Sequence, residues 1–158
     1  MMAGGCATIT IEPKYPSPTG YLVDGSALIQ DLDKTKIEYM ILELKRKTTV
    51  EVAVVTVDST EPLAIEKYAI NLFNRFGIGQ KGNDNGVLLL VAYKDHRMRI
   101  EVGHGLMGVL TDKKCSEIIN RIMVPNFQSG RFSQGILDAT WVIVSIISSN
   151  STKRKYEN

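Results

Sequence analysis

The chain has 158 residues, of which 44% are hydrophobic and 23% are charged. This size and composition are those of one globular domain, and they exclude a wholly disordered or coiled-coil chain. Nineteen basic and 17 acidic side chains give a formal charge of +2, which argues against nucleic-acid binding because that function concentrates basic charge on one face. Two cysteines are too few for a disulfide framework and leave the redox compartment open.

No apolar stretch approaches the ~20 residues that a membrane-spanning helix needs. The most apolar stretch, residues 139–147, is about half that length and contains Thr140 and Ser145. The first residues also lack the basic and then apolar pattern of a signal peptide. We therefore expect no transmembrane segment and no leader in this chain as given.

The first half of the chain begins with an extended lead-in over residues 1–20, where three prolines disfavour helix. Apolar residues at nearly helical spacing predict a helix within residues 26–47, with Asp24 or Ser26 as its N-cap. A continuous β-branched run at 50–57 predicts a strand that is buried on both faces.

The middle of the chain continues with a predicted helix at 63–76 and a glycine-rich loop at 77–86. A second apolar strand is expected at 87–93. The alternating pattern of residues 97–102 predicts a hairpin partner for it. Another glycine-rich loop follows at 103–108.

The remaining sequence predicts a helix at 113–127, which Thr111 or Asp112 caps and Pro125 bends or ends, and a final helix at 135–148. Residues 150–158 are expected to be a basic, solvated tail. The strand–helix–strand unit predicts parallel strands with a right-handed crossover. Since these strands need cover on both sides, we expect a three-layer α/β/α sandwich, with a mixed β-sheet and helices on both faces.

Three candidate chemical motifs lie in predicted structural surroundings that do not suit their chemistry. Residues 77–82 match G-x-G-x-x-G, but they follow a helix and precede a strand, the reverse of a dinucleotide site, so Gly77 is expected to be a helix C-cap. Cys115 and Arg121 have the spacing of a cysteine phosphatase, but they lie inside a predicted helix that has no glycine loop. His96 and His104 have no elbow serine or cysteine with them, and no zinc motif occurs.

Oxygen-bearing side chains gather instead around one loop pair. Asp84 and Asn85 precede the second long strand, and Glu101 ends the hairpin strand that returns to the same edge. Carboxylate and amide oxygens among glycines suit Ca²⁺ or Mg²⁺. An ordinary turn and an ion pair between Glu101 and a neighbouring arginine explain the same residues, so both interpretations stay open. The rim of this site would consist of Gly82, Gly86, Gly103, His104 and Gly105.

Two further aspartates are expected at the other end of the sheet. Asp58 ends the first long strand, so parallel strands place it opposite Asp84, and Asp24 should lie nearer Asp58. Asp24 is then expected to be a helix cap.

Three blocks stand out as longer motifs, namely PTGYLVD at 18–24, LFNRFGIGQKGNDNGVLLLVA at 72–92 and RIEVG at 99–103. Together they resemble the TPM domain family, which includes thylakoid-lumen proteins of photosystem II repair and bacterial envelope proteins. The resemblance covers about residues 15–148 and implies an α/β/α sandwich with a Rossmann-like mixed sheet. It also implies divalent-cation binding in some members, a phosphatase activity proposed for a plant member, and frequent signal peptides or membrane anchors.

By position, the resemblance maps the family's acidic motif residues onto Asp24, Asp84 and Glu101. The sequence departs from the family at Met107, where a second carboxylate is common, and at His104, where an aromatic residue is usual. One carboxylate fewer weakens a cation site, and no phosphatase nucleophile can be carried over.

These observations lead us to expect a TPM-like domain at residues 21–149, located in the cell envelope or outside the cytoplasm. It would bind Ca²⁺ or Mg²⁺ and contact a membrane-protein or envelope-protein partner. The alternatives are a metal-assisted acid phosphatase and a purely structural interaction module. The expected cation ligands are Asp84, Asn85 and Glu101, with Asp24 as a further ligand.

Overall fold

The computed structural model of the chain describes residues 4–5, 7 and 9–156. Its centre is a mixed four-stranded sheet in which the first three strands are parallel and the fourth is antiparallel to the third. This is the mixed sheet expected from the sequence, with a short edge strand added. In spatial order the strands are β1 (Leu22–Asp24), β2 (Glu51–Val57), β3 (Gly86–Ala92) and β4 (Arg97–Val102).

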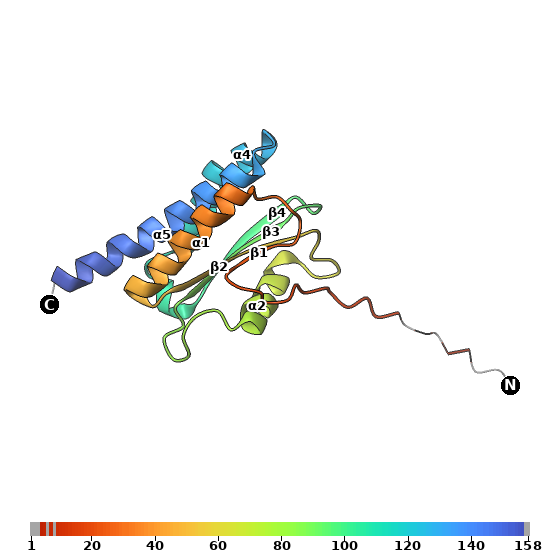
Figure 1. The fold of residues 1–158 in the computed structure, drawn as a ribbon. Helices are drawn as coiled ribbons and strands as arrows, with labels where there is room; N and C mark the ends of the chain where they lie inside the picture. The colour runs from red at the N-terminus through yellow and green to blue at the C-terminus, as the bar shows by residue number, and fades with distance from the viewer. Residues whose placement is uncertain (1–3, 6, 8, 157–158) are drawn as a thin grey trace.

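Helices cover both faces of the sheet, so the predicted three-layer α/β/α sandwich is confirmed (Figure 1). Val52 and Val54 point toward α1 (Asp31–Thr48) and α5 (Phe132–Tyr156). The alternate residues of β2 point toward α2 (Ile65–Phe76). Because both faces of β2 and β3 are buried, these strands are continuous apolar runs rather than alternating ones.

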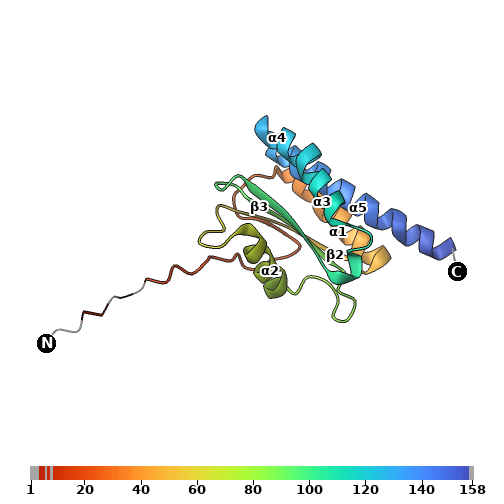
Figure 2. The ribbon, with the colours of Figure 1, turned by 180° about the vertical axis from the view of Figure 1, so that it is seen from behind.

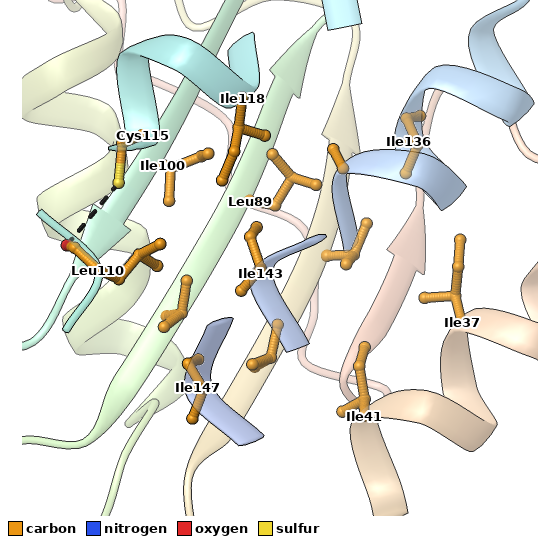
Figure 3. Close-up of a cluster of buried hydrophobic side chains, with 14 of the residues drawn as sticks. Ile37, Ile41, Leu89, Ile100, Leu110, Cys115, Ile118, Ile136, Ile143 and Ile147 are labelled. Carbon is orange, nitrogen blue, oxygen red and sulfur yellow. Dashed lines mark hydrogen bonds between the residues drawn. The ribbon is translucent and has the colours of Figure 1, made fainter. Parts of the chain in front are cut away.

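The larger core lies between the sheet and the layer of α1 and α5. In Figure 3, Ile37 and Ile41 from α1 and Ile143 from α5 converge on Leu89 of β3. All four side chains are fully buried, and burial of an aliphatic side chain of this size contributes about 1.5–3 kcal/mol. Figure 2 shows that α3 (Asp112–Ile118) lies on this same side of the sheet, opposite α2.

The two crossovers, β1–α1–β2 and β2–α2–β3, step in the same direction across the sheet. Their helices nevertheless cover opposite faces. The crossovers therefore have opposite hands, so the right-handed preference holds for only one of them.

Two of the expected helices, at 26–47 and at 113–127, differ from their predictions. α1 begins at Asp31 rather than near Ser26, because the preceding residues form a turn around Asp24. The single helix expected at 113–127 is interrupted by a π-helical turn. Its three parts are α3, η2 (Ile119–Met123) and α4 (Val124–Gln128).

α5 is longer than expected and includes most of the predicted solvated tail, up to Tyr156. Residues 132–154 are long and apolar enough to cross a membrane by length and composition, although 39% of the tested window is buried inside the protein. Core helices of soluble proteins pass the same test, and Ile136, Ile143 and Ile147 of α5 pack on the sheet. The described residues of the lead-in form no helix or strand, in line with the expected extended segment, and Tyr15 stacks on Tyr68 of α2 with ring centroids 4.6 Å apart.

Candidate functional site

The two glycine-rich loops meet at the amino end of β3, as expected. The N–H group of Gly105, in the η1 turn (His104–Leu106), donates to the Asp84 carbonyl oxygen at 3.0 Å. A Cβ atom on Gly103 would lie 2.2 Å from that same oxygen, and one on Gly105 would lie 2.1 Å from the Asn83 carbonyl oxygen. Backbone contact this close requires glycine at both positions.

Asn85 is a structural residue of this loop pair. It is 8% exposed, and its Oδ1 accepts the Gln80 N–H at 2.8 Å. Its Nδ2 donates to Thr49 Oγ1 at 3.1 Å. The amide oxygen that the sequence offered as a cation ligand therefore holds the loop onto the end of α1.

Asp84 and Glu101 differ in exposure and in their partners. Asp84 is exposed with a φ of 46°. Glu101 has an 18% exposed side chain, and its Oε2 accepts both Nε of Arg99, at 3.2 Å, and Nη2, at 3.0 Å. The ion pair that was one of the two interpretations of Glu101 is therefore present. Within the described residues, no three His, Cys, Asp or Glu side chains are grouped to hold a metal ion.

Asp24 lies at the opposite end of the sheet, beside Thr56 of β2. Five strand positions, about 17 Å, separate Thr56 from Glu51, which pairs with the start of β3. Burial alone would raise the pKa of Asp24, but hydrogen bonds from Thr56 and two backbone N–H groups outweigh it and lower the pKa. Asp24 thus closes the turn after β1, and the structure does not bring it to Asp84.

Glu51 is a carboxylate of the loop pair that the sequence analysis missed. Its Oε2 accepts the Gly79 N–H at 2.8 Å, and its Oε1 lies 3.0 Å from Nζ of Lys45 and 3.2 Å from the Tyr21 hydroxyl. Burial raises the pKa of Glu51 by itself, and these partners more than offset that effect, so the pKa is lowered. A lone charge at the start of an otherwise apolar strand is the sequence signal for such an anchor.

A separate cavity, the hairpin pocket, lies at the other end of the sheet, where β3 ends and β4 begins. It has a volume of about 370 Å³, within the range of small-ligand pockets. This location agrees with the tendency of α/β sheets to bind ligands at the carboxyl ends of their parallel strands. The pocket is lined by Val91, Ala92, Tyr93, His96, Arg97, Met98, Val124, Phe127, Gln128 and Phe132.

Three aromatic rings form one wall of the hairpin pocket. Phe132 makes edge-to-face contacts with Tyr93, at a centroid distance of 5.3 Å, and with Phe127, at 5.1 Å. The two phenylalanines meet because Gly130, with a φ of 73°, reverses the chain between α4 and α5. Gly135 faces the Phe127 ring, and a Cβ atom there would lie 2.9 Å from it.

Arg97 lines the hairpin pocket and also a second hollow that contains Asp95 and Glu66 on the α2 side of β4. Asp95 and Arg97 lie close enough for their charges to interact. His96 also lines the hairpin pocket, whose own lining contains no Asp or Glu. Among the described residues, Arg97 forms no ion pair within 4 Å. The pocket therefore suits an apolar group, for which the aromatic rings supply the contact surface. Sequence reasoning missed it, although Tyr93 beside His96–Arg97 and two phenylalanines around Gly130 were the available signals.

The candidate nucleophile Cys115 and the candidate bases His96 and His104 lie on different elements. Cys115 is 7% exposed in α3, and burial followed by the nearby Asp112 charge raises the pKa of its thiol to about 11. His96 lies in the β3–β4 turn, and His104 lies at the opposite end of the sheet in η1. Neither histidine is hydrogen-bonded to a nucleophile among the described residues, so these side chains do not form a triad.

Three solved structures have folds similar to that of this chain. The N-terminal domain of a protein from P. gingivalis has a TM-score of 0.77 and 28% identity, over 82% of this chain and 83% of that one. The BA42 protein from Bizionia argentinensis has a TM-score of 0.65 and 21% identity, over 78% and 84% of the two chains. The N-terminal domain of the cg2496 protein from Corynebacterium glutamicum has a TM-score of 0.62 and 17% identity, over 90% of this chain and 87% of that one.

No curated protein matches the chain. A family model described as the TPM domain matches residues 22–146, from β1 into α5. This family is associated in general with extracytoplasmic or envelope proteins. The match spans the whole sheet and the helices on both of its faces, so the chain belongs to the TPM domain family.

Proposed function

We propose that this TPM domain is a binding module of the cell envelope. Its hairpin pocket holds an apolar, negatively charged group of a protein partner. The observation that supports this proposal is the aromatic wall, with Arg97 and His96 in the same lining. Aromatic rings supply apolar contact, and the guanidinium selects a carboxylate by charge-assisted hydrogen bonds.

The experiment uses sodium 3-phenylpropanoate as a probe, with the neutral 3-phenylpropanamide as its matched control. We expect the acid to shift backbone amides of residues 91–98 and 124–132 in an isotope-labelled sample. Because the probe is small, we expect its dissociation constant to be on the order of millimolar. The amide should bind several-fold more weakly because it gives Arg97 no charge to pair with.

Arg97→Gln should remove the preference for the acid over the amide while leaving the binding of the amide unchanged. Arg46→Gln is the matched control, since it also removes one arginine but at the distant end of α1. An equal affinity for both probes in the unmodified protein, or shifts outside the two segments, would refute the proposal.

A second candidate function is weak divalent-cation binding at the loop pair. It is favoured by the exposed Asp84 carboxylate, which has no hydrogen-bond partner among the described side chains, close to the end of the strand that carries Glu101. The fit is partial, because Asn85 is committed to Gln80 and Thr49, and Asp24 lies at the other end of the sheet. Two carboxylates and backbone carbonyls would hold Ca²⁺ or Mg²⁺ with the affinity of weak extracellular sites.

Titration with Ca²⁺ tests this candidate. Amides of residues 82–86 and 101–108 should shift with a dissociation constant of about 0.1–1 mM, and Asp84→Asn should abolish the shifts. Asp31→Asn, a fully exposed carboxylate on α1, should leave them unchanged. No shift at about 10 mM Ca²⁺ would exclude the site.

A metal-assisted phosphatase depends on that cation. If the activity exists, Asp84→Asn should abolish turnover of a phosphate ester at acidic pH. Turnover that survives this substitution would belong to another protein in the preparation.

A further inference from the structure

Two neighbouring hollows, here called the basic hollows, lie along the C-terminal half of α5. Their volumes are about 330 and 440 Å³, and they share Val109 and Asn150 in their walls. They lie near the loop pair and not at the hairpin pocket, so an inference from them does not depend on the binding function proposed for that pocket. The first also touches Asn83 and Gly105 of the loop pair.

The helix sequence explains why both hollows are polar. Residues 147, 150, 151 and 154 of α5 line the first hollow, and residues 146, 149, 150 and 153 line the second together with Ser145. Each set of four has the i, i+3, i+4, i+7 spacing of one helix face, and the two sets are one residue apart. Serine, asparagine and basic residues fill most of these positions, so two adjacent polar stripes line the hollows, although the Ser151 hydroxyl donates to the Ile147 carbonyl oxygen.

The charges in the basic hollows all have one sign. Arg154 lines the first, and Lys153 and Lys114 line the second, while neither lining contains Asp or Glu. None of the three cations forms an ion pair within 4 Å among the residues that the structure places. The Lys114 ammonium donates to the Val109 carbonyl oxygen at 2.8 Å, which holds it at the shared wall.

A structural role explains only part of this arrangement. Cations in the last turns of a helix offset the negative end of its dipole, which accounts for Lys153 and Arg154. Lys114 belongs to α3 and comes to the same wall from a different element. The neutral donor Asn83 lines the first hollow together with Arg154, and the helix dipole does not require it.

We infer that the basic hollows bind the phosphate group of a phosphoester. A phosphate offers several strong acceptor oxygens, and it is matched by one guanidinium, two ammonium groups and the surrounding amide and hydroxyl donors. The group could belong to a small soluble phosphoester or to the headgroup of an anionic phospholipid, and the experiment separates these sources.

Two probes are titrated into the labelled full chain at low ionic strength. The soluble probe is glycerol 3-phosphate, and the lipid probe is a phosphatidylcholine vesicle with or without phosphatidylglycerol. We expect saturable shifts of amides in residues 104–114 and 145–154, with an affinity on the order of millimolar for the soluble probe.

Arg154→Gln and Lys114→Gln are the test variants, and each should weaken binding about tenfold. Lys67→Gln, an exposed residue of α2 on the opposite face of the sheet, removes the same unit of charge and is the matched control. It should leave binding within about twofold, because a distant exposed charge is screened by salt. Unchanged amide spectra elsewhere verify that each variant is folded.

Every outcome decides between the alternatives. Binding of glycerol 3-phosphate that only the two test variants weaken supports a site for soluble phosphoesters. Binding only to phosphatidylglycerol vesicles, lost in the same two variants, supports the site with lipid as the source. If Lys67→Gln weakens binding as much as Arg154→Gln, the attraction reflects net charge alone and the inference is overturned; absence of binding to both probes overturns it as well.

Discussion

Replacing Asp24 with asparagine removes the carboxylate that closes the turn after β1, at nearly constant volume. This carboxylate has a 5% exposed side chain. It accepts the N–H groups of Leu28 and Ile29, both at 3.0 Å, and the Thr56 hydroxyl at 2.6 Å. An amide keeps one acceptor oxygen but points an NH₂ group at one of these donors. A hydrogen bond to a buried charged group is worth about 1.5–3 kcal/mol, so we expect the free energy of unfolding to fall by about 2–3 kcal/mol.

The loss should depend on pH in a defined direction. The native pKa of Asp24 lies below its ordinary value of 3.8. The stability that the carboxylate contributes is therefore complete above the pKa of the unfolded chain, and it is lost as pH falls through the native pKa. The difference in unfolding free energy between the unmodified protein and Asp24→Asn should be constant from neutral pH down to about pH 5, and smaller by about pH 3.

Urea unfolding followed by circular dichroism, with a chelator present, measures this difference. Asp58→Asn is the matched control at the same end of the sheet. Its side chain is 58% exposed, and it contacts the Ser26 hydroxyl and Lys94, so it should cost less than about 1 kcal/mol. Equal losses for the two variants would refute the reasoning. A loss for Asp24→Asn that appears only when Ca²⁺ is added would instead identify Asp24 as a cation ligand.

Two further predictions concern the loop pair and the buried thiol. Gly103→Ala should lower the free energy of unfolding by about 1–3 kcal/mol, because its Cβ would collide with a backbone oxygen. Gly108→Ala, which has open space at its Cβ, should cost little by the same urea assay, and equal costs would contradict the close contact. In a Cys6→Ser background, Cys115 should react with an aromatic disulfide reagent far more slowly in native protein than in urea, because its thiol is buried and its pKa is raised to about 11. Fast reaction of the native protein would show that α3 opens readily.

The sequence was most informative where one local rule acted alone. The apolar runs of β2 and β3 could be assigned because burial on both faces leaves few alternatives, and Gly77 was recognised as a helix C-cap, which its φ of 60° confirms. β1 was missed because its three residues pair only with β2, and a strand this short has no periodicity to detect. The helix at 113–127 was expected to bend or end at Pro125, and the π-helical turn before it was missed because such a turn leaves no clear mark in apolar spacing.

The candidate sites depended on tertiary contacts that spacing does not encode. Asn85 carries the right atoms for a cation ligand. Because more than nine-tenths of this residue is buried, its amide instead forms hydrogen bonds with two neighbouring segments. The hairpin pocket needs Tyr93 and Phe132 to meet, although they are far apart in sequence and belong to different elements. The position of Asp24 opposite Asp84 followed from strand direction alone, and the strand register confirms it.

The most direct test of the binding proposal is an intermolecular NOE measurement between 3-phenylpropanoate and the protein. The proposal predicts contacts from the ring protons of the probe to Phe127, Phe132 and the Met98 methyl group. Contacts confined to Tyr39 and Trp141, which are exposed on α1 and α5, would contradict it.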